Sequence, residues 1–159
     1  MTMKGGSGSK LNSMLEVDVK MVAMDHHQNH IVLLTDKLDK KVLPIWVGPF
    51  EAQAIAMPLQ DELSVRPLTH DLIKACCDKL EGSIEKVVIT DITPEGTYYA
   101  EIYLQHEQHI QIVDSRPSDA IALALRWEAP IFITMKLVEF TLDPDNVVFE
   151  RPDDEEDFH

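Results

Sequence analysis

PSDAIALA, residues 117–124, decides the fold, because it repeats the pattern of PFEAQAIA, residues 49–56. The two stretches lie 68 positions apart and share a proline, three alanines and an acidic third residue, so that Glu51 faces Asp119. The same shift also places turn on turn and strand on strand around them, without a gap. Agreement of whole elements at one fixed period indicates an internal duplication.

Alternating apolar and polar residues predict three strands before each proline helix. The strands of the first copy are expected at 14–24, 31–34 and 42–47, and those of the second at 84–92, 98–104 and 110–113. After the proline helix the first copy adds a long helix at 67–80, whereas the second adds a short buried strand and a helical turn within 129–140. We therefore predict an α+β fold, a duplicated three-strand plus helix unit with a mostly antiparallel sheet and helices packed on it.

The composition predicts one domain, because 159 residues with 45% apolar residues suffice for one sizeable core. We expect the domain at 14–142, a flexible arm or cloning remnant at 1–13, and an acidic, disordered tail at 143–159. No apolar run approaches the roughly 20 residues of a membrane-spanning helix. The adjacent Cys76 and Cys77 suit neither a mutual disulfide nor a zinc site, which favours the reducing cytoplasm.

The charge is strongly acidic, with 28 Asp and Glu against 14 Lys and Arg and a net charge of −14. Such a chain repels nucleic acid at long range, so phosphate chemistry would need local cations or a divalent metal. The common signatures of nucleotide-binding loops, zinc proteases and serine hydrolases are missing from the sequence.

DSRPSDAIALALR, residues 114–126, contains the second proline helix and allows two interpretations. It can be a well-built helix start, because proline suits the first turn and Asp119 complements the positive end of the helix dipole. Alternatively, the charges of Asp114, Arg116 and Asp119 around Pro117 form part of a chemical site. The residues of this stretch leave both interpretations open.

RPLTHDL, residues 66–72, opens the long helix with another Arg-Pro pair. Helical spacing would place Arg66 and His70 on one side, and Leu68, Leu72, Cys76 and Leu80 on a separate apolar face. His70 and Asp71 are residue types that act as a general base or as metal ligands. The alternative is that Asp71 stabilises the helix start and His70 is an exposed polar residue.

The order of five motifs resembles that of the bifunctional nuclease family. These motifs are LPIWVGPFEAQAIA (43–56), RPLTHDL (66–72), VVITDI (87–92), TYYAEI (97–102) and DSRPSDAIALALR (114–126). The resemblance spans about residues 15–140, departs from the usual pattern at 57–65 and in the acidic tail, and implies hydrolysis of phosphodiester bonds in DNA and RNA.

Carried over residue by residue, the resemblance implies a site of nine polar residues: Glu51, Arg66, Thr69, His70, Asp71, Asp114, Arg116, Ser118 and Asp119. The catalytic residues would be His70, Asp71 and Asp119. The phosphate-binding residues would be Arg66, Arg116, Thr69 and Ser118. A divalent metal, Mg²⁺ or Mn²⁺, would be held by Asp71, Asp114, Asp119 and Glu51.

A non-enzymatic module is the main alternative to a nuclease. In this interpretation the chain is a dimeric regulatory or protein-binding domain, and Arg66, Arg116, Asp71 and Asp119 form a buried ion-pair network. The acidity and the lack of a dense basic patch favour it. A small-molecule-binding domain that uses anion-binding helix starts is a third possibility. In each case we expect a homo-oligomer, most simply a dimer, because the edges of a sheet remain open to pairing.

Overall fold

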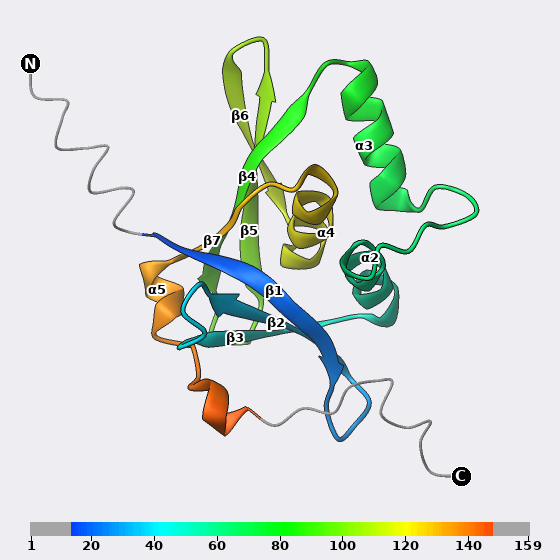
Figure 1. Cartoon of the computed structure of the whole chain (residues 1–159). Coiled ribbons are helices and arrows are strands. Elements are labelled where there is room, and N and C mark those ends of the chain that lie inside the picture. Colours follow the sequence, from blue (N-terminus) through cyan, green and yellow to red (C-terminus); the bar gives the residue numbers. More distant parts are fainter. Residues whose placement is uncertain (1–13, 148–159) are drawn as a thin grey trace, which may run out of the picture.

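The computed structural model describes residues 14–147, which form one seven-stranded sheet with helices packed against it (Figure 1). The strand order is β3-β2-β1-β7-β4-β5-β6. All neighbouring strands are antiparallel except β4 and β7, which are parallel. The predicted α+β fold with a mostly antiparallel sheet is confirmed.

The two copies have the same element order. The first contains β1 (Met14–Met24), β2 (His30–Asp36), β3 (Val42–Val47) and α2 (Pro49–Leu59), and the second contains β4 (Ser83–Ile92), β5 (Tyr98–His106), β6 (His109–Ser115) and α4 (Pro117–Trp127). In each copy the third strand leads into a helix with proline in its first turn. The connecting elements are α3 (Thr69–Lys79), β7 (Ile131–Thr134), α5 (Met135–Val138) and the short 3₁₀ helix η1 (Pro144–Asn146).

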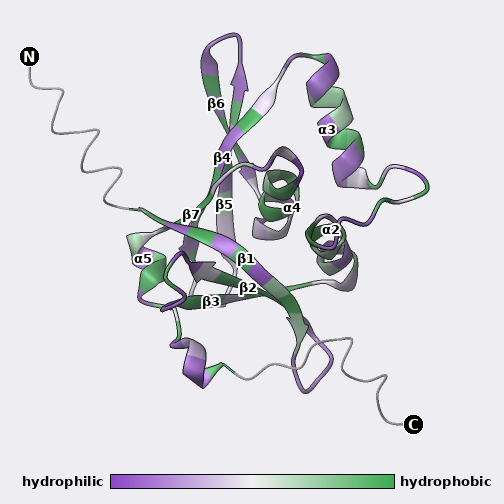
Figure 2. Cartoon of the chain, viewed as in Figure 1, coloured by the Kyte–Doolittle hydropathy of each residue, from purple (hydrophilic) through white to green (hydrophobic). Residues whose placement is uncertain are grey.

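The main core lies between the sheet and α4. Five consecutive residues of this helix, Ala120 to Ala124, are buried, and they pack against strand residues such as Val87 and Ile102. Figure 2 shows the hydrophobic residues along α4 and the strands beside it. Alanine side chains allow close approach, so α2 packs directly beside α4. The neighbouring first turns of these two helices position the site described below.

A smaller apolar cluster lies on the opposite face of β2. Ile31 and Leu33 belong to it, whereas Val32 and Leu34 belong to the main core, as the alternation of a strand requires. Val147 packs against this second cluster, just after η1, in a stretch that the sequence placed in the acidic tail. The predicted arm at 1–13 and the rest of the tail lie outside the described residues.

The helix α3 differs from its prediction at its start and in its packing. It begins at Thr69, so Arg66 and Pro67 precede it, and Arg66 does not share a helix side with His70. Leu72 and Leu80 are 56% and 73% exposed, and His70 is the one buried residue of this helix. The cause is that α2 and α4 already cover the sheet, so α3 contacts α4 mainly through polar residues of its first turn. Within the described chain, no helix has the length and apolar character needed to cross a membrane.

Candidate functional site

The candidate site lies where the first turns of α2, α3 and α4 meet. Each of these turns carries an acidic residue at its third position: Glu51, Asp71 and Asp119. The free N–H groups and the positive dipole end of a helix stabilise an acid at this position. Hydrogen bonds from Arg116 to Glu51 and from His70 to Asp119 join the three turns side by side.

Arg116 links α4 to α2 through its guanidinium group. Its Nε donates to Asp119 Oδ2 at 2.9 Å, one terminal nitrogen donates to Asp119 Oδ1 at 3.2 Å, and the other donates to Glu51 Oε1 at 3.3 Å. A guanidinium has five N–H groups, so two remain for a ligand. The side chain is 64% exposed, so these two groups can be reached from solvent.

The glycine before α2 makes room for the Glu51 carboxylate. A Cβ atom at Gly48 would overlap the carboxylate of Glu51, which folds back over the helix start. In this position the carboxylate accepts the hydrogen bond from Arg116. A side chain at position 48 would therefore displace the Glu51 carboxylate from the position in which it bonds to Arg116.

His70, which is buried, and Asp119, which is partly buried, form a pair between α3 and α4. His70 Nε2 lies 2.9 Å from Asp119 Oδ1. Burial opposes ionisation of Asp119, but the hydrogen bonds from Arg116 and His70 outweigh it and lower the pKa of the Asp119 carboxyl. An ionised carboxylate only accepts hydrogen bonds, so His70 Nε2 carries the proton of this bond. The other ring nitrogen, Nδ1, has no hydrogen-bond partner within residues 14–147. It is not fully buried, because no fully buried side-chain nitrogen or oxygen of the described residues lacks a partner.

A cavity of about 330 Å³ brings these groups together. Its wall includes Glu51, His70, Arg116 and Asp119, together with Phe50, Gln53, Ala54, Leu68 and Thr69. Phe50 is 81% exposed, which leaves an aromatic ring available to a ligand beside the Arg116 guanidinium. The cavity combines two carboxylates, a partly exposed guanidinium, an oriented imidazole and an exposed aromatic ring, which are groups that contact a polar ligand with a planar part.

Four of the nine residues named from the sequence lie elsewhere. Arg66 is exposed in the loop before α3, and Asp114 is exposed on β6 opposite Glu101. Ser118 is buried and lines a neighbouring cavity on the β3 side of Arg116. Asp71 accepts from the backbone N–H of Leu68 and from Arg126, so it caps α3 and pairs with α4. Glu51, Thr69, His70, Arg116 and Asp119 do come together, and their chemical roles stay predictions.

The carboxylates of the site do not form a metal-binding group. Among residues 14–147, no three His, Cys, Asp or Glu side chains are arranged to hold a metal ion. Glu51 and Asp119 are bound to Arg116, Asp71 is bound to Arg126, and Asp114 lies on another element. This donor set does not fit Mg²⁺ or Mn²⁺, which prefer several converging oxygen ligands.

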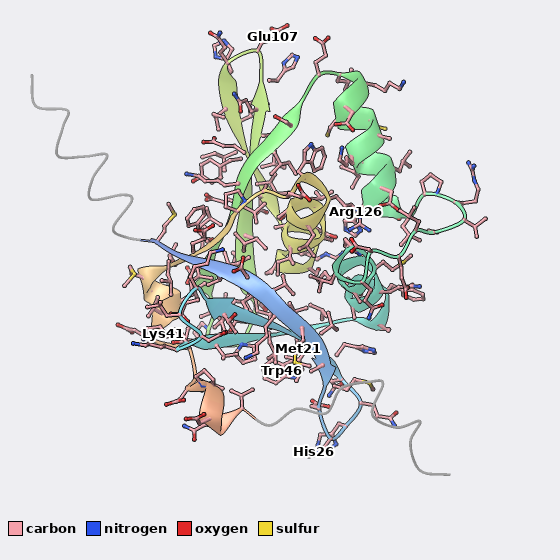
Figure 3. All side chains as sticks on the ribbon, in the orientation of Figure 1. Met21, His26, Lys41, Trp46, Glu107 and Arg126 are labelled. Carbon is pink, nitrogen blue, oxygen red and sulfur yellow. The ribbon has the colours of Figure 1, made fainter. Side chains whose placement is uncertain are left out.

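Sequence reasoning missed Arg126, whose side chain lies at the meeting point of the three helices (Figure 3). It donates to Asp71 Oδ1 at 2.7 Å, to the Ala54 carbonyl of α2 at 2.8 Å and to the Ala122 carbonyl of α4 at 2.9 Å. The signal was present in the sequence, because Arg126 follows Asp119 by two helical turns on an otherwise apolar helix.

Comparison with known proteins gives one family and two groups of relatives. The family model of the bifunctional nuclease domain matches residues 32–142. An uncharacterized protein of Mycobacterium tuberculosis is 40% identical over 119 residues, which cover 74% of this chain and 70% of the relative. Bifunctional nuclease 1 of Oryza sativa subsp. japonica is 27% identical over 70% of this chain, and bifunctional nuclease 2 of Arabidopsis thaliana is 29% identical over 67%. These matches span 34% and 33% of the two plant proteins.

Proposed function

The chain belongs to the bifunctional nuclease domain family, and from this membership we propose that it hydrolyses phosphodiester bonds in DNA and RNA. The observation that carries the proposal is the cavity at the three helix starts, where Arg116 lies beside the His70–Asp119 pair. Phosphodiester hydrolysis needs a group that binds the phosphate and a base that activates water, and in this proposal Arg116 and His70 take these two roles.

In the proposed reaction, Arg116 binds non-bridging phosphate oxygens through its two free N–H groups. His70 Nδ1 accepts a proton from a water molecule, and the water oxygen forms a bond to phosphorus while the ester P–O bond breaks. The proton then passes from His70 to the leaving oxygen. Asp119 holds the His70 ring through Nε2, and Phe50 offers a surface for a nucleic-acid base.

The test is a nuclease assay on highly purified protein, with an Asp119→Asn variant purified identically. Asn keeps the size of the side chain but loses the charge that holds His70 and Arg116, so hydrolysis of both DNA and RNA should fall about 100-fold. Because an amide oxygen can still stabilise the start of α4, the free energy of unfolding should fall by only about 0.5 to 1 kcal/mol. Equal activity in both preparations would mean that a contaminating enzyme or another site is responsible.

Dependence on Mg²⁺ or Mn²⁺ is a separate proposal that rests on the family resemblance alone. The reaction outlined above contains no step through a metal, because the carboxylates of the site are bound to arginines. Assays with added Mg²⁺, with added Mn²⁺ and with excess chelator decide this point.

We likewise propose a cytoplasmic location, which is supported by two free cysteines, Cys76 and Cys77.

A second candidate function is a regulatory or protein-binding module, which is favoured by the ion pairs of the site. Asp71 is paired with Arg126, and Glu51 and Asp119 share Arg116. However, Arg116 is largely exposed, and the network predicted from the sequence was a buried one that included Arg66. A wild-type protein without hydrolysis above buffer, in every metal condition, would favour this module over the nuclease.

A further inference from the structure

The attachment of α3 to the rest of the molecule is polar and concentrated in its first turn. His70 is the one buried residue of the helix, and both Leu72 within it and Leu80 at its C-cap are mostly exposed. The polar contacts with α4 in the described part of the chain include the His70–Asp119 pair, the Asp71–Arg126 pair and the Lys74 ammonium 5.2 Å from the centre of the Trp127 ring. The position of His70 therefore depends on charged and hydrogen-bonded partners.

Two consecutive residues of α3 are held at two points of α4. Asp119 and Arg126 lie seven residues apart on α4, which is about two turns, or roughly 10 Å along the helix axis. His70 contacts the first and Asp71 contacts the second. Two anchors of this spacing fix both the location and the direction of the first turn of α3, whereas a single anchor would leave it free to rotate.

Arg126 is the rigid part of this arrangement. Its side chain is 7% exposed, and its bonds to the Ala54 and Ala122 carbonyls hold the guanidinium between α2 and α4. Asp71 is itself oriented, because its second oxygen accepts from the Leu68 backbone N–H at 2.9 Å. A planar guanidinium fork can satisfy three acceptors at once, which the single ammonium group of lysine cannot do in the same geometry.

We propose that Arg126, acting through Asp71, is a positioning residue that holds His70 Nε2 against Asp119 and thereby sets the tautomer of the catalytic imidazole. The proposal rests on the proposed function for the role of His70 as a base. The tautomer of the His70 ring, however, can be measured without any turnover. Arg126 does not line the cavity, so it acts on the reaction through its neighbours. Asp71 connects it to His70, and its bond to the Ala54 carbonyl connects it to α2, which Asp71→Asn leaves in place.

The test compares Asp71→Asn, Arg126→Lys and Arg126→Met with the wild type. Asp71→Asn is the most informative variant, because the amide oxygen can still accept from Leu68 while Arg126 keeps its two carbonyl partners. Asp91→Asn is the matched control, since Asp91 also accepts from a backbone N–H, that of Ile92, and from a basic side chain, Lys136, but contacts no part of α3. Asp119→Ala, which leaves no acceptor for His70 Nε2, gives the reference for a lost His70–Asp119 bond.

The decisive readout is the nitrogen NMR spectrum of the His70 ring, which distinguishes a single Nε2–H tautomer from a mixture. We expect one tautomer in the wild type and in Asp91→Asn, and a mixture in Asp71→Asn and Arg126→Met, with Arg126→Lys between them. In the nuclease assay, kcat of Asp71→Asn should fall about 10- to 100-fold with little change in KM, because Arg116 is untouched. If Arg126→Met does not fold, Asp71→Asn still decides the question.

The two proposals fail in different ways. An unchanged His70 spectrum in Asp71→Asn overturns the positioning role, whatever the activity. A mixed spectrum with full nuclease activity supports the positioning role and overturns His70 as the base. A wild type that shows the single tautomer but no hydrolysis, together with a mixed spectrum in Asp71→Asn, supports the positioning role and overturns the proposed function.

Discussion

At the scale of the residue, the candidate site depends on how one arginine divides its hydrogen bonds. Arg116 donates two hydrogen bonds to Asp119 and one to Glu51, so its single positive charge offsets part of the repulsion that these two carboxylates would exert on a phosphate. The internal repeat predicted the equivalence of Glu51 and Asp119, and the structure places both on this arginine. It did not predict the partner of Asp71, because Arg126 lies 55 residues away and local patterns carry no information about such pairs.

Arg116→Lys tests this division of hydrogen bonds. Lysine keeps the positive charge but cannot bridge two carboxylates and a phosphate, so kcat/KM should fall about 10- to 100-fold. The side chain is mostly exposed, so the free energy of unfolding should change by no more than about 0.5 kcal/mol. Steady-state kinetics and urea unfolding measure the two effects. Arg66→Lys is the control, and an equal loss of activity in that variant would contradict the separation of the two Arg-Pro motifs.

At the scale of the element, the sequence predicted what is repetitive and local. Alternation located the strands, with β1 and β3 matching their predicted bounds, and proline located the starts of α2 and α4. The start of α3 was wrong because Arg66-Pro67 was treated as equivalent to Arg116-Pro117. Arg116 immediately precedes its helix, whereas Pro67 is followed by Leu68, which is extended and occupies the N-cap position of α3. Two identical dipeptides thus have different structural roles.

The polar attachment of α3 predicts that this helix opens before the sheet does. Its backbone N–H groups should exchange with solvent through a local opening, whereas those of α4 require global unfolding because α4 is part of the core. In Asp71→Asn, the exchange rate of the α3 amides should be about tenfold higher than in the wild type, which corresponds to a decrease of ~1.4 kcal/mol in the free energy of the local opening. The exchange rates of the α4 amides should not change. Native-state hydrogen exchange followed by NMR measures both helices in one sample. Equal protection of α3 and α4 would show that the exposed residues of α3 are covered in solution.

At the scale of the whole molecule, exposed apolar side chains and a high negative charge oppose each other. Leu63 and Val65, between α2 and α3, are 96% and 99% exposed, and Ile112 on the edge strand β6 is 57% exposed. Buried apolar surface favours association, whereas a net charge of −14 disfavours it. At physiological salt we expect the burial of apolar side chains to outweigh the repulsion between the acidic chains, because salt screens the charges.

A homodimer is the expected assembly, as the open strand edges already indicated. Light scattering at micromolar concentration should give twice the mass of 18.0 kDa in physiological salt. Lowering the salt should shift the equilibrium toward the monomer, since repulsion between the acidic chains is then less screened. A monomeric mass in both conditions would contradict the prediction.

The acidic side chains of the site also determine how the stability of the whole molecule depends on pH. For Asp71 and Asp119, burial opposes ionisation, but hydrogen bonds from Arg126 and Leu68 in one case, and from Arg116 and His70 in the other, lower the pKa of each carboxyl. In the unfolded chain the pKa of an aspartate is about 3.9. At a pH between the lowered pKa of the folded protein and the pKa of the unfolded chain, the unfolded state binds more protons than the folded state. The free energy of unfolding therefore rises with pH in this range. The contribution of both carboxyls is therefore complete above about pH 5 and is lost as the pH falls through their folded pKa values.

Urea unfolding between pH 6 and pH 3 measures this contribution as a difference between variants. The wild type should lose stability below about pH 4, and Asp71→Asn and Asp119→Asn should each lose less, by on the order of 1 kcal/mol, since neither has the carboxyl that titrates. The difference should be smaller for Asp71, whose side chain is 39% exposed and partly screened by water. Asp25, whose pKa is lowered to about 2 chiefly by the backbone of Asn29, contributes equally to all three proteins and cancels. Parallel pH profiles of the three proteins would mean that the arginine pairs of the site do not stabilise the ionised carboxyls.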